Sequence, residues 1–243
     1  MILSCICFFD IKYRRENTKL REAIVKFNRK SFLNTHRDAW VEVNLDCIEH
    51  NILEFKKYLK KGAKLFAVVK ADAYGHGAVM IAPILLASGV DFLGVSSIDE
   101  GLQLREAEIT APILVLGAVP VWSFDRAAQN NISISVFSDE HIEACKQTYN
   151  KLGIKPKVHV KIDTGMNRIG VRPEDATEFI KKIQDCNFIK LEGIFTHFAT
   201  AETESYALEQ YKKFRSVVDS VDTKNLLIHC CNTSATVCYK DFD

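Results

Sequence analysis

The sequence predicts an α/β fold, and within that class a (β/α)8 TIM-type barrel. Short apolar runs rich in β-branched residues, typical of buried strands, alternate along the chain with amphipathic stretches of helical period. Eight such runs occur at a regular pitch, which favours a parallel sheet covered by helices and closed into a barrel. A doubly wound open sheet would give the same periodicity and stays open as the alternative.

Each predicted element follows from its local pattern. The predicted strands are residues 40–45, 64–70, 92–96, 113–117, 132–137, 157–163, 190–197 and 226–231. The predicted helices are residues 48–59, 78–87, 99–107, 139–152, 173–184 and 205–221. Asp139 and Ser205 are expected N-caps, because short polar side chains accept hydrogen bonds from the first helical N–H groups. Pro173 suits the first turn of its helix, where no N–H group is needed.

Composition narrows the class of protein. The 243 residues are 47% hydrophobic and 26% charged, as in a protein with a real core, and the net charge of +1 gives no reason to expect nucleic-acid binding. We expect no membrane span, because no apolar run is long enough. The eight cysteines show no CxxC pair and no paired histidine spacing, which favours reduced thiols in a cytoplasmic enzyme over a zinc site or a disulfide framework.

Residues 1–37 differ from the rest of the chain. They begin with an apolar segment that lacks the basic start and the cleavage site of a signal peptide, and they continue as a basic stretch. We expect a poorly ordered N-terminal extension outside the fold.

The segment that carries most information is Val68–Gly77, VVKADAYGHG. A buried strand delivers Lys70 to the carboxyl edge of the sheet, where α/β folds place their chemistry. Burial makes an ammonium group costly and lowers the pKa of a lysine, so the amine becomes a nucleophile towards a carbonyl. A lone lysine at a strand end is more often a side chain whose charged head reaches out to water.

Four motifs in order resemble one family. VVKADAYGHG is similar to the cofactor-lysine motif of alanine racemases, which are fold-type III pyridoxal-phosphate enzymes. KIDTGMNRIG at 161–170, IFTHFA at 194–199 and HCCNTSA at 229–235 resemble three further motifs of that family. Together they cover residues 38–236, which is far more specific than any single match.

The resemblance changes the strand count. In the family, the strand that matches 40–45 belongs to a C-terminal β domain, and the barrel begins at the lysine strand. The resemblance therefore implies that residues 38–243 form an incomplete barrel domain, truncated before its last strand, with the C-terminal β domain absent. We expect the chain to be a fragment of a longer protein.

The resemblance also assigns roles to residues. Lys70 would hold pyridoxal 5′-phosphate as a Schiff base and then act as a base on the substrate's α-carbon. Tyr74 would line the cofactor pocket, and His197 would stack on the pyridine ring. The phosphate would bind the loop Asn232, Thr233 and Ser234, where Thr233 replaces the family's serine but keeps a hydroxyl.

Two further residues would act on the substrate side. Arg168 would bind the substrate carboxylate, because its planar fork suits a carboxylate and is always charged. Lys161 matches a lysine that is carbamylated in some members, where the carbamate gives the nearby arginine an anionic partner. Asp163 is expected to orient the loop between them.

The implied function is the racemisation of L-alanine to D-alanine, which supplies D-alanine for peptidoglycan. The resemblance implies a cytoplasmic enzyme that is a homodimer in its full-length form, with no metal, membrane or nucleic-acid partner. We expect the 243 residues alone to be inactive, because the family's second acid/base, a tyrosine, lies beyond Asp243. A fold-type III amino-acid decarboxylase and a non-catalytic pyridoxal-phosphate-binding barrel remain alternatives.

Overall fold

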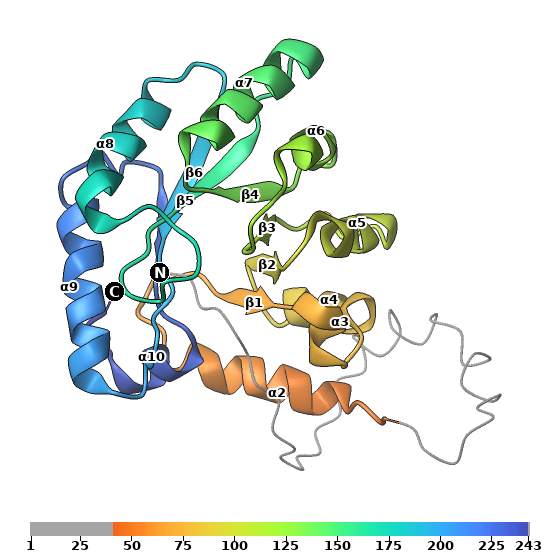
Figure 1. Cartoon of the computed structure of the whole chain (residues 1–243). Helices are drawn as coiled ribbons and strands as arrows, with labels where there is room; N and C mark the ends of the chain where they lie inside the picture. Colours follow the sequence, from red (N-terminus) through yellow and green to blue (C-terminus); the bar gives the residue numbers. More distant parts are fainter. Residues whose placement is uncertain (1–40, 243) are drawn as a thin grey trace.

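A curled sheet of seven parallel strands forms the centre of the molecule (Figure 1). The computed structural model describes residues 41–242. Each strand pairs with the next one along the chain, in the order β1 to β7. The strands are β1 (Phe66–Val68), β2 (Phe92–Val95), β3 (Ile113–Val115), β4 (Ser133–Val136), β5 (Lys157–Lys161), β6 (Lys190–Phe195) and β7 (Leu227–His229).

Helices cover the outer face of this sheet. They follow one another around it in chain order, so each βα unit lies beside the next (Figure 1). The helices are α2 (Leu45–Lys56), α3 (Lys70–Tyr74), α4 (Ala78–Ala87), α5 (Ile98–Glu106), the 3-10 turn η2 (Val121–Ser123), α6 (Phe124–Gln129), α7 (Asp139–Leu152), α8 (Pro173–Gln184), α9 (Glu204–Val218) and α10 (Thr233–Cys238).

The predicted parallel α/β barrel architecture is confirmed, with seven strands in a single all-parallel sheet. No pairing joins β1 to β7 within residues 41–242. The two strands still approach each other across the interior, where the Phe66 and His229 rings lie 5.9 Å apart. The described part of the chain is therefore a curled, open barrel.

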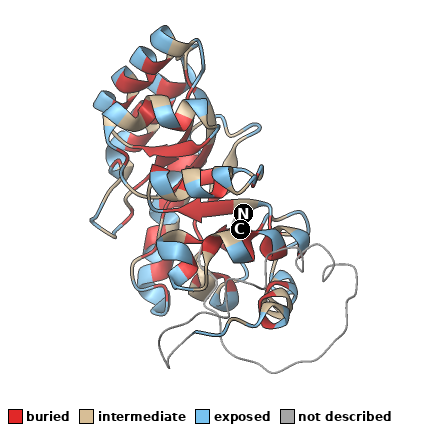
Figure 2. Cartoon of the chain, turned by 90° about the vertical axis from the view of Figure 1, so that its right-hand side faces the viewer, coloured by how far each residue is buried: buried red, intermediate tan, exposed pale blue. Residues whose placement is uncertain are grey.

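Two apolar regions stabilise the fold. The larger one fills the space between the sheet and the helices, and the smaller one, around Phe66, Val68 and Leu114, fills the inside of the curl. The strands are largely buried, while the helices are buried on one side and exposed on the other (Figure 2). Burying a side chain such as Phe124 contributes roughly 1.5–3 kcal/mol, so the helical layer is a major source of stability.

Alternation along β5 sends polar side chains inward. Val158 and Val160 pack in the helix-facing core, whereas His159 and Lys161 point to the inside and are buried there. Successive side chains of a strand face opposite sides of the sheet. The interior of the curl is therefore polar near β5, and this places ionisable groups beneath the carboxyl ends of the strands.

The predicted strand at 40–45 is wrong over the described residues. Val41 to Asn44 form no regular structure, and Leu45 begins α2, with the Asn44 side chain accepting hydrogen bonds from the N–H groups of Asp46 and Cys47. A strand needs a neighbouring strand, and β1 to β7 offer this segment no pairing. Trp40 and the predicted extension 1–37 lie outside the described residues.

The two predicted N-caps are also wrong by one or two positions. Asp139 is the first residue of α7, and Ser138 holds the extended cap conformation; Thr203, not Ser205, does so for α9. Neither cap residue makes a side-chain cap hydrogen bond. At α7 the Nδ1 atom of His141 instead accepts from the N–H of Phe137 at 3.1 Å. Pro173 opens α8, as predicted.

Candidate active site

A cavity of about 290 Å³ opens at the carboxyl ends of the strands. This volume lies near the lower end of the roughly 300–1,000 Å³ range of small-molecule sites. All eight residues singled out in the sequence line it, namely Lys70, Tyr74, Lys161, Arg168, His197, Asn232, Thr233 and Ser234. The fold therefore brings together side chains that lie up to 164 positions apart (234 − 70) in the sequence.

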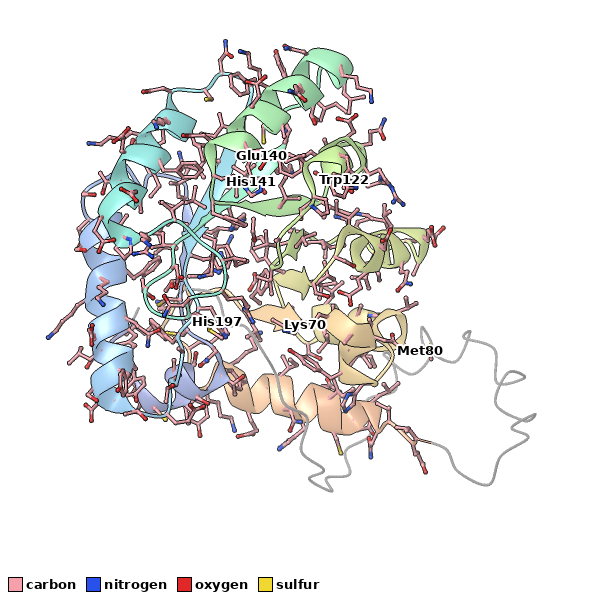
Figure 3. The ribbon with its side chains drawn as sticks, in the orientation of Figure 1. Lys70, Met80, Trp122, Glu140, His141 and His197 are labelled. Carbon is pink, nitrogen blue, oxygen red and sulfur yellow. The ribbon has the colours of Figure 1, made fainter. Side chains whose placement is uncertain are left out.

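Lys70 reaches the cavity from the end of β1. It does not close a strand as predicted; after Val69 it begins the short helix α3, and it is half-buried rather than buried. Its Nζ atom lies 5.8 Å from the centre of the Tyr74 ring. Lys70 and His197 lie near each other at the centre of the molecule, whereas Trp122 and Met80 lie at its periphery (Figure 3).

The backbone after Lys70 makes a left-handed helical turn. Ala71, Asp72, Ala73 and Tyr74 all have φ between 51° and 56°. This region costs a non-glycine residue roughly 1–2 kcal/mol. No sequence pattern indicated this turn apart from Gly75, whose φ of 89° ends it.

Three side chains hold the left-handed turn in place. A Glu100 carboxylate oxygen on α5 accepts from the Ala71 N–H at 2.7 Å. Asp72 accepts from the Ala78 N–H at 2.7 Å, and the His76 ring lies 2.8 Å from the Ala73 carbonyl. His76, for which the sequence indicated no role, thus supports the turn that positions Lys70.

Lys161 is buried on the inside of β5. Its Nζ donates to the carbonyl of Ile162 at 2.7 Å and lies 5.6 Å from the centre of the Phe195 ring. Burial lowers the pKa of Lys161 to about 8; the Asp163 carboxylate opposes this shift, and the positive charge of Arg168 adds to it. A substantial fraction of this amine is therefore neutral near pH 8.

His197 follows β6, which ends at Phe195, two residues before it. Burial lowers the pKa of His197 to about 4, and the positive charges of Lys161, Arg168 and Lys70 add to this shift. The ring is therefore neutral at pH 7. These three cationic side chains all line the cavity, which suits an anionic ligand.

Arg168 lies on the exposed loop that follows β5. Asp163 organises this loop, because its carboxylate accepts from the N–H groups of Gly165 and Asn167 at 3.1 and 3.0 Å. Gly170 has φ of 131°, and a Cβ atom there would come within 2.7 Å of the Asp163 nitrogen. The loop therefore needs glycine at that position to bring Arg168 over the cavity.

The loop after β7 presents one hydroxyl group without a partner. Asn232 caps α10 by accepting from the Ala235 N–H at 2.9 Å, and Ser234 donates to Glu202 at 2.9 Å. The Oγ1 atom of Thr233 is buried and makes no hydrogen bond. A buried hydroxyl rarely stays unsatisfied, and Thr233 lines the cavity, so this hydroxyl can donate to a ligand there.

Sequence reasoning left out several residues that line the cavity. His229, the first residue of the HCCNTSA motif, borders it and also lies 3.0 Å from His159, nitrogen to nitrogen, in the interior. The Phe195 ring stacks on His229 at 4.7 Å. Val68, Leu116, Cys230 and Cys231 complete much of the wall. The inward alternation of β1 and β7 was the signal that could have identified Val68 and His229.

Helices long and apolar enough to cross a membrane are absent from residues 41–242. Within the same residues, no group of three or more histidine, cysteine or acidic side chains is arranged to hold a metal ion.

Comparisons with known proteins assign the chain to one family. Residues 43–243 match the family described as "Alanine racemase, N-terminal domain". Alanine racemase 1 of Oceanobacillus iheyensis is 42% identical over 215 residues, which are 86% of this chain and 57% of that protein. The chain thus spans little more than half the length of this curated relative.

Solved structures give the same picture. The alanine racemase of Clostridium difficile 630 superposes with a TM-score of 0.82 at 38% identity, covering 86% of this chain and 56% of that one. Histidine racemase from Leuconostoc mesenteroides subsp. sake has a TM-score of 0.78 at 28% identity, covering 86% and 57%. The fold is therefore shared with amino-acid racemases.

Proposed function

Because this chain belongs to the family of the alanine racemase N-terminal domain, we propose that it is the cofactor-binding part of a pyridoxal-phosphate-dependent amino-acid racemase. The proposed substrate is alanine, and Lys70 is the proposed cofactor lysine and base. The observation that carries this proposal is the meeting of Lys70, neutral His197 and the partnerless Thr233 hydroxyl in one cavity.

The cavity suits the three parts of the cofactor. The buried Thr233 hydroxyl is a free donor for a phosphate oxygen. Neutral His197 offers an aromatic face without the charge repulsion that an imidazolium would bring to the cationic wall. Lys70 provides an amine for the aldehyde carbon. Of the two hydroxyls in this loop, Thr233 is the better phosphate donor, since Ser234 already donates to Glu202.

When bound, the cofactor draws electrons from the substrate's α-carbon and so makes its proton easier to remove. Lys70 Nζ is the proposed acceptor of that proton on its face of the substrate. Two hydrogen bonds of the left-handed turn, from the Ala71 N–H to Glu100 and from the Ala78 N–H to Asp72, fix the backbone from which Lys70 projects. A fixed base keeps the reacting atoms close, which is a large part of the catalytic effect.

Arg168 is the proposed contact for the substrate carboxylate. It lines the cavity together with Lys161 and His197, and its positive charge lowers the pKa of both groups. A guanidinium can donate two parallel hydrogen bonds to a carboxylate. The substrate would thus be held by its carboxylate while Lys70 acts on its α-carbon.

Lys161 carries a further prediction, carbamylation. The neutral amine attacks carbon dioxide and releases a proton, and a pKa of about 8 leaves more neutral amine than an ordinary lysine has. The resulting anion would give Arg168 an opposite charge in place of a like one. A carbamate signal with ¹³C-labelled bicarbonate that Lys161→Met abolishes would support this, and its absence would refute it.

The wider setting is proposed from the relatives. We propose a homodimeric, cytoplasmic enzyme that supplies D-alanine for peptidoglycan. One similar structure is a histidine racemase, so proteins of this fold differ in the side chain of the amino acid on which they act. Racemisation of other small amino acids by a longer protein containing this chain, in preference to alanine, would overturn the alanine assignment.

A matched pair of variants tests the cofactor proposal. Thr233→Val removes the partnerless hydroxyl, whereas Ser234→Ala removes the neighbouring hydroxyl that already has Glu202 as its partner. Loss of a hydrogen bond to a charged group costs about 1.5–3 kcal/mol, so Thr233→Val should weaken pyridoxal-phosphate binding roughly 10- to 150-fold. Ser234→Ala should weaken it much less. Pyridoxal, which lacks the phosphate, should bind the unsubstituted protein and Thr233→Val equally. An affinity of Thr233→Val for pyridoxal phosphate equal to that of the unsubstituted protein would contradict the proposal.

A further inference from the structure

Two adjacent cysteines form part of the cavity wall. Cys230 and Cys231 follow directly after β7, and both line the cavity that contains Lys70 and Thr233. Their sulfur atoms lie 3.7 Å apart. Both side chains are otherwise buried, with 6% and 1% of their surfaces exposed. The cavity is therefore the route by which a small molecule would reach this pair.

The placement of the two thiols depends on where β7 ends. Adjacent residues in a strand point to opposite faces, which would separate the two sulfur atoms. The strand ends at His229, and the chain then bends into the Asn232 cap of α10, so both thiols turn to the same side. Both also approach the carbonyl of Phe242, at 3.4 Å for Cys230 and 3.8 Å for Cys231.

We propose that Cys230 and Cys231 are a redox-sensitive dithiol, which a hydroperoxide oxidises to a disulfide that disables the Thr233 loop. One thiol attacks the peroxide, gains an oxygen as a sulfenic acid and releases water or an alcohol. The second thiol attacks that sulfur and releases water as the S–S bond forms. The two sulfurs lose two electrons in total, and the peroxide O–O bond is reduced by two.

Closing the disulfide must move the loop. An S–S bond is about 2.05 Å long, so sulfur atoms now 3.7 Å apart have to approach by more than about 1.5 Å. The peptide unit between them leads directly into Asn232 and Thr233, so it cannot rotate without moving that loop. The contacts of both thiols with the Phe242 carbonyl are also lost.

The consequence for ligand binding rests on the proposed function. If Thr233 donates to the cofactor phosphate, then oxidation of the dithiol weakens cofactor binding, and a thiol reductant restores it. The bound cofactor would in turn block the route to the pair. The other described thiols differ: Cys145 is buried in α7 with its pKa raised to about 12 by burial, and Cys238 is exposed.

The first experiment tests disulfide formation in the absence of the cofactor. The ligand-free chain is treated with hydrogen peroxide and digested, and its peptides are weighed. We expect the peptide with Cys230 and Cys231 to lose two hydrogens, and we expect Cys230→Ser and Cys231→Ser each to prevent this loss. Cys145→Ser is the matched control and should leave it unchanged. Phenylarsine oxide, which needs two nearby thiols, should label the same peptide with loss of one water.

The second experiment measures hydrogen exchange in the loop and the affinity for the cofactor. Amide hydrogen exchange in the peptide that spans Asn232 to Cys238 should rise on oxidation, and pyridoxal-phosphate affinity should fall at least tenfold and recover with dithiothreitol. Oxidation that gives no disulfide at this pair, or a disulfide that changes neither exchange nor affinity, would overturn the inference. A reduced chain that never binds pyridoxal phosphate would instead refute the proposed function. Peptide masses and hydrogen exchange would still test whether Cys230 and Cys231 form a disulfide that changes the loop.

Discussion

At the scale of single residues, Arg168 combines charge with shape. Its guanidinium is exposed on a loop, and its positive charge helps to lower the pKa values of Lys161 and His197. An arginine and a lysine carry the same charge there, but only arginine offers two parallel donors to a carboxylate. A role in binding the substrate can therefore be separated from a purely electrostatic one.

The first residue-scale prediction is that Arg168→Lys harms catalysis and leaves folding intact. In a longer family protein that contains this chain, loss of the bidentate contact should cost about 2–4 kcal/mol in kcat/KM. The exposed position of Arg168 means that the urea midpoint should hardly change. Kinetics that match the unsubstituted protein would show that Arg168 does not hold the carboxylate.

At the scale of elements, the left-handed turn of α3 depends on Glu100. Its carboxylate accepts from the N–H of Ala71 at 2.7 Å and from the N–H and hydroxyl of Ser96 at 2.7 and 2.9 Å. Burial raises the pKa of Glu100, and the hydrogen bonds from Ser96, Ala71 and Ser97 outweigh it, so the net pKa is lowered. The carboxylate thus joins β2, α5 and the segment after Lys70.

The element-scale prediction is that Glu100→Ala disturbs this turn. It removes the acceptor of the Ala71 and Ser96 donors, and because both residues are exposed, each lost hydrogen bond should cost about 0.5–1.5 kcal/mol. Urea unfolding should show a loss of this order, and cofactor binding through Lys70 should weaken too. Asp99→Ala is the neighbouring control, because Asp99 makes only an exposed ion pair with Arg126, at 3.3 Å, worth at most about 1 kcal/mol. Equal effects of both substitutions would contradict the role of Glu100.

The sequence predicted the long periodic elements well. The bounds of α4, α7 and α8 agree with the prediction, and β1 to β7 lie within the predicted runs. Amphipathic spacing and apolar runs are local signals, so they can be read from one chain. The short elements α3, α6 and α10 were missed, because one or two turns carry too little periodic signal.

The remaining errors have a tertiary origin. The segment at 40–45 has the apolar character of a strand, but pairing decides whether a strand forms, and pairing is not a local property. The motifs indicated all eight candidate site residues, and the structure brings them into one cavity. Sequence could not show that Thr233 rather than Ser234 has the free hydroxyl, because that depends on Glu202, 32 positions before Ser234.

At the scale of the whole molecule, buried histidines link stability to pH. Burial lowers the pKa of His159 to about 4, with Glu192 opposing the shift, and burial also lowers the pKa of His229. In the unfolded chain a histidine has a pKa near 6.5. Between these values the unfolded state binds more protons than the folded state, so stability falls as the pH falls from about 6.5 to 4.

The whole-molecule prediction is a loss of stability between pH 8 and pH 5. His159 alone should contribute about 2 kcal/mol of that loss, measured by urea unfolding at the two pH values. His159→Asn, which cannot titrate, should reduce the difference between the two pH values by about this amount. Ser135→Ala, a change to another buried polar residue, should lower stability equally at both. An unchanged pH dependence in His159→Asn would show that this histidine does not remain neutral in the fold.

The proposed function requires that Lys70 holds the cofactor in this cavity. The most direct test is to incubate the chain with pyridoxal phosphate, reduce it with borohydride and map the labelled peptide. We predict that the label falls on Lys70, that Lys70→Ala removes it, and that Lys161→Met, which alters the other lysine of the cavity, leaves it on Lys70. A label on Lys161 or on a surface lysine, with Lys70 unmodified, would contradict the account.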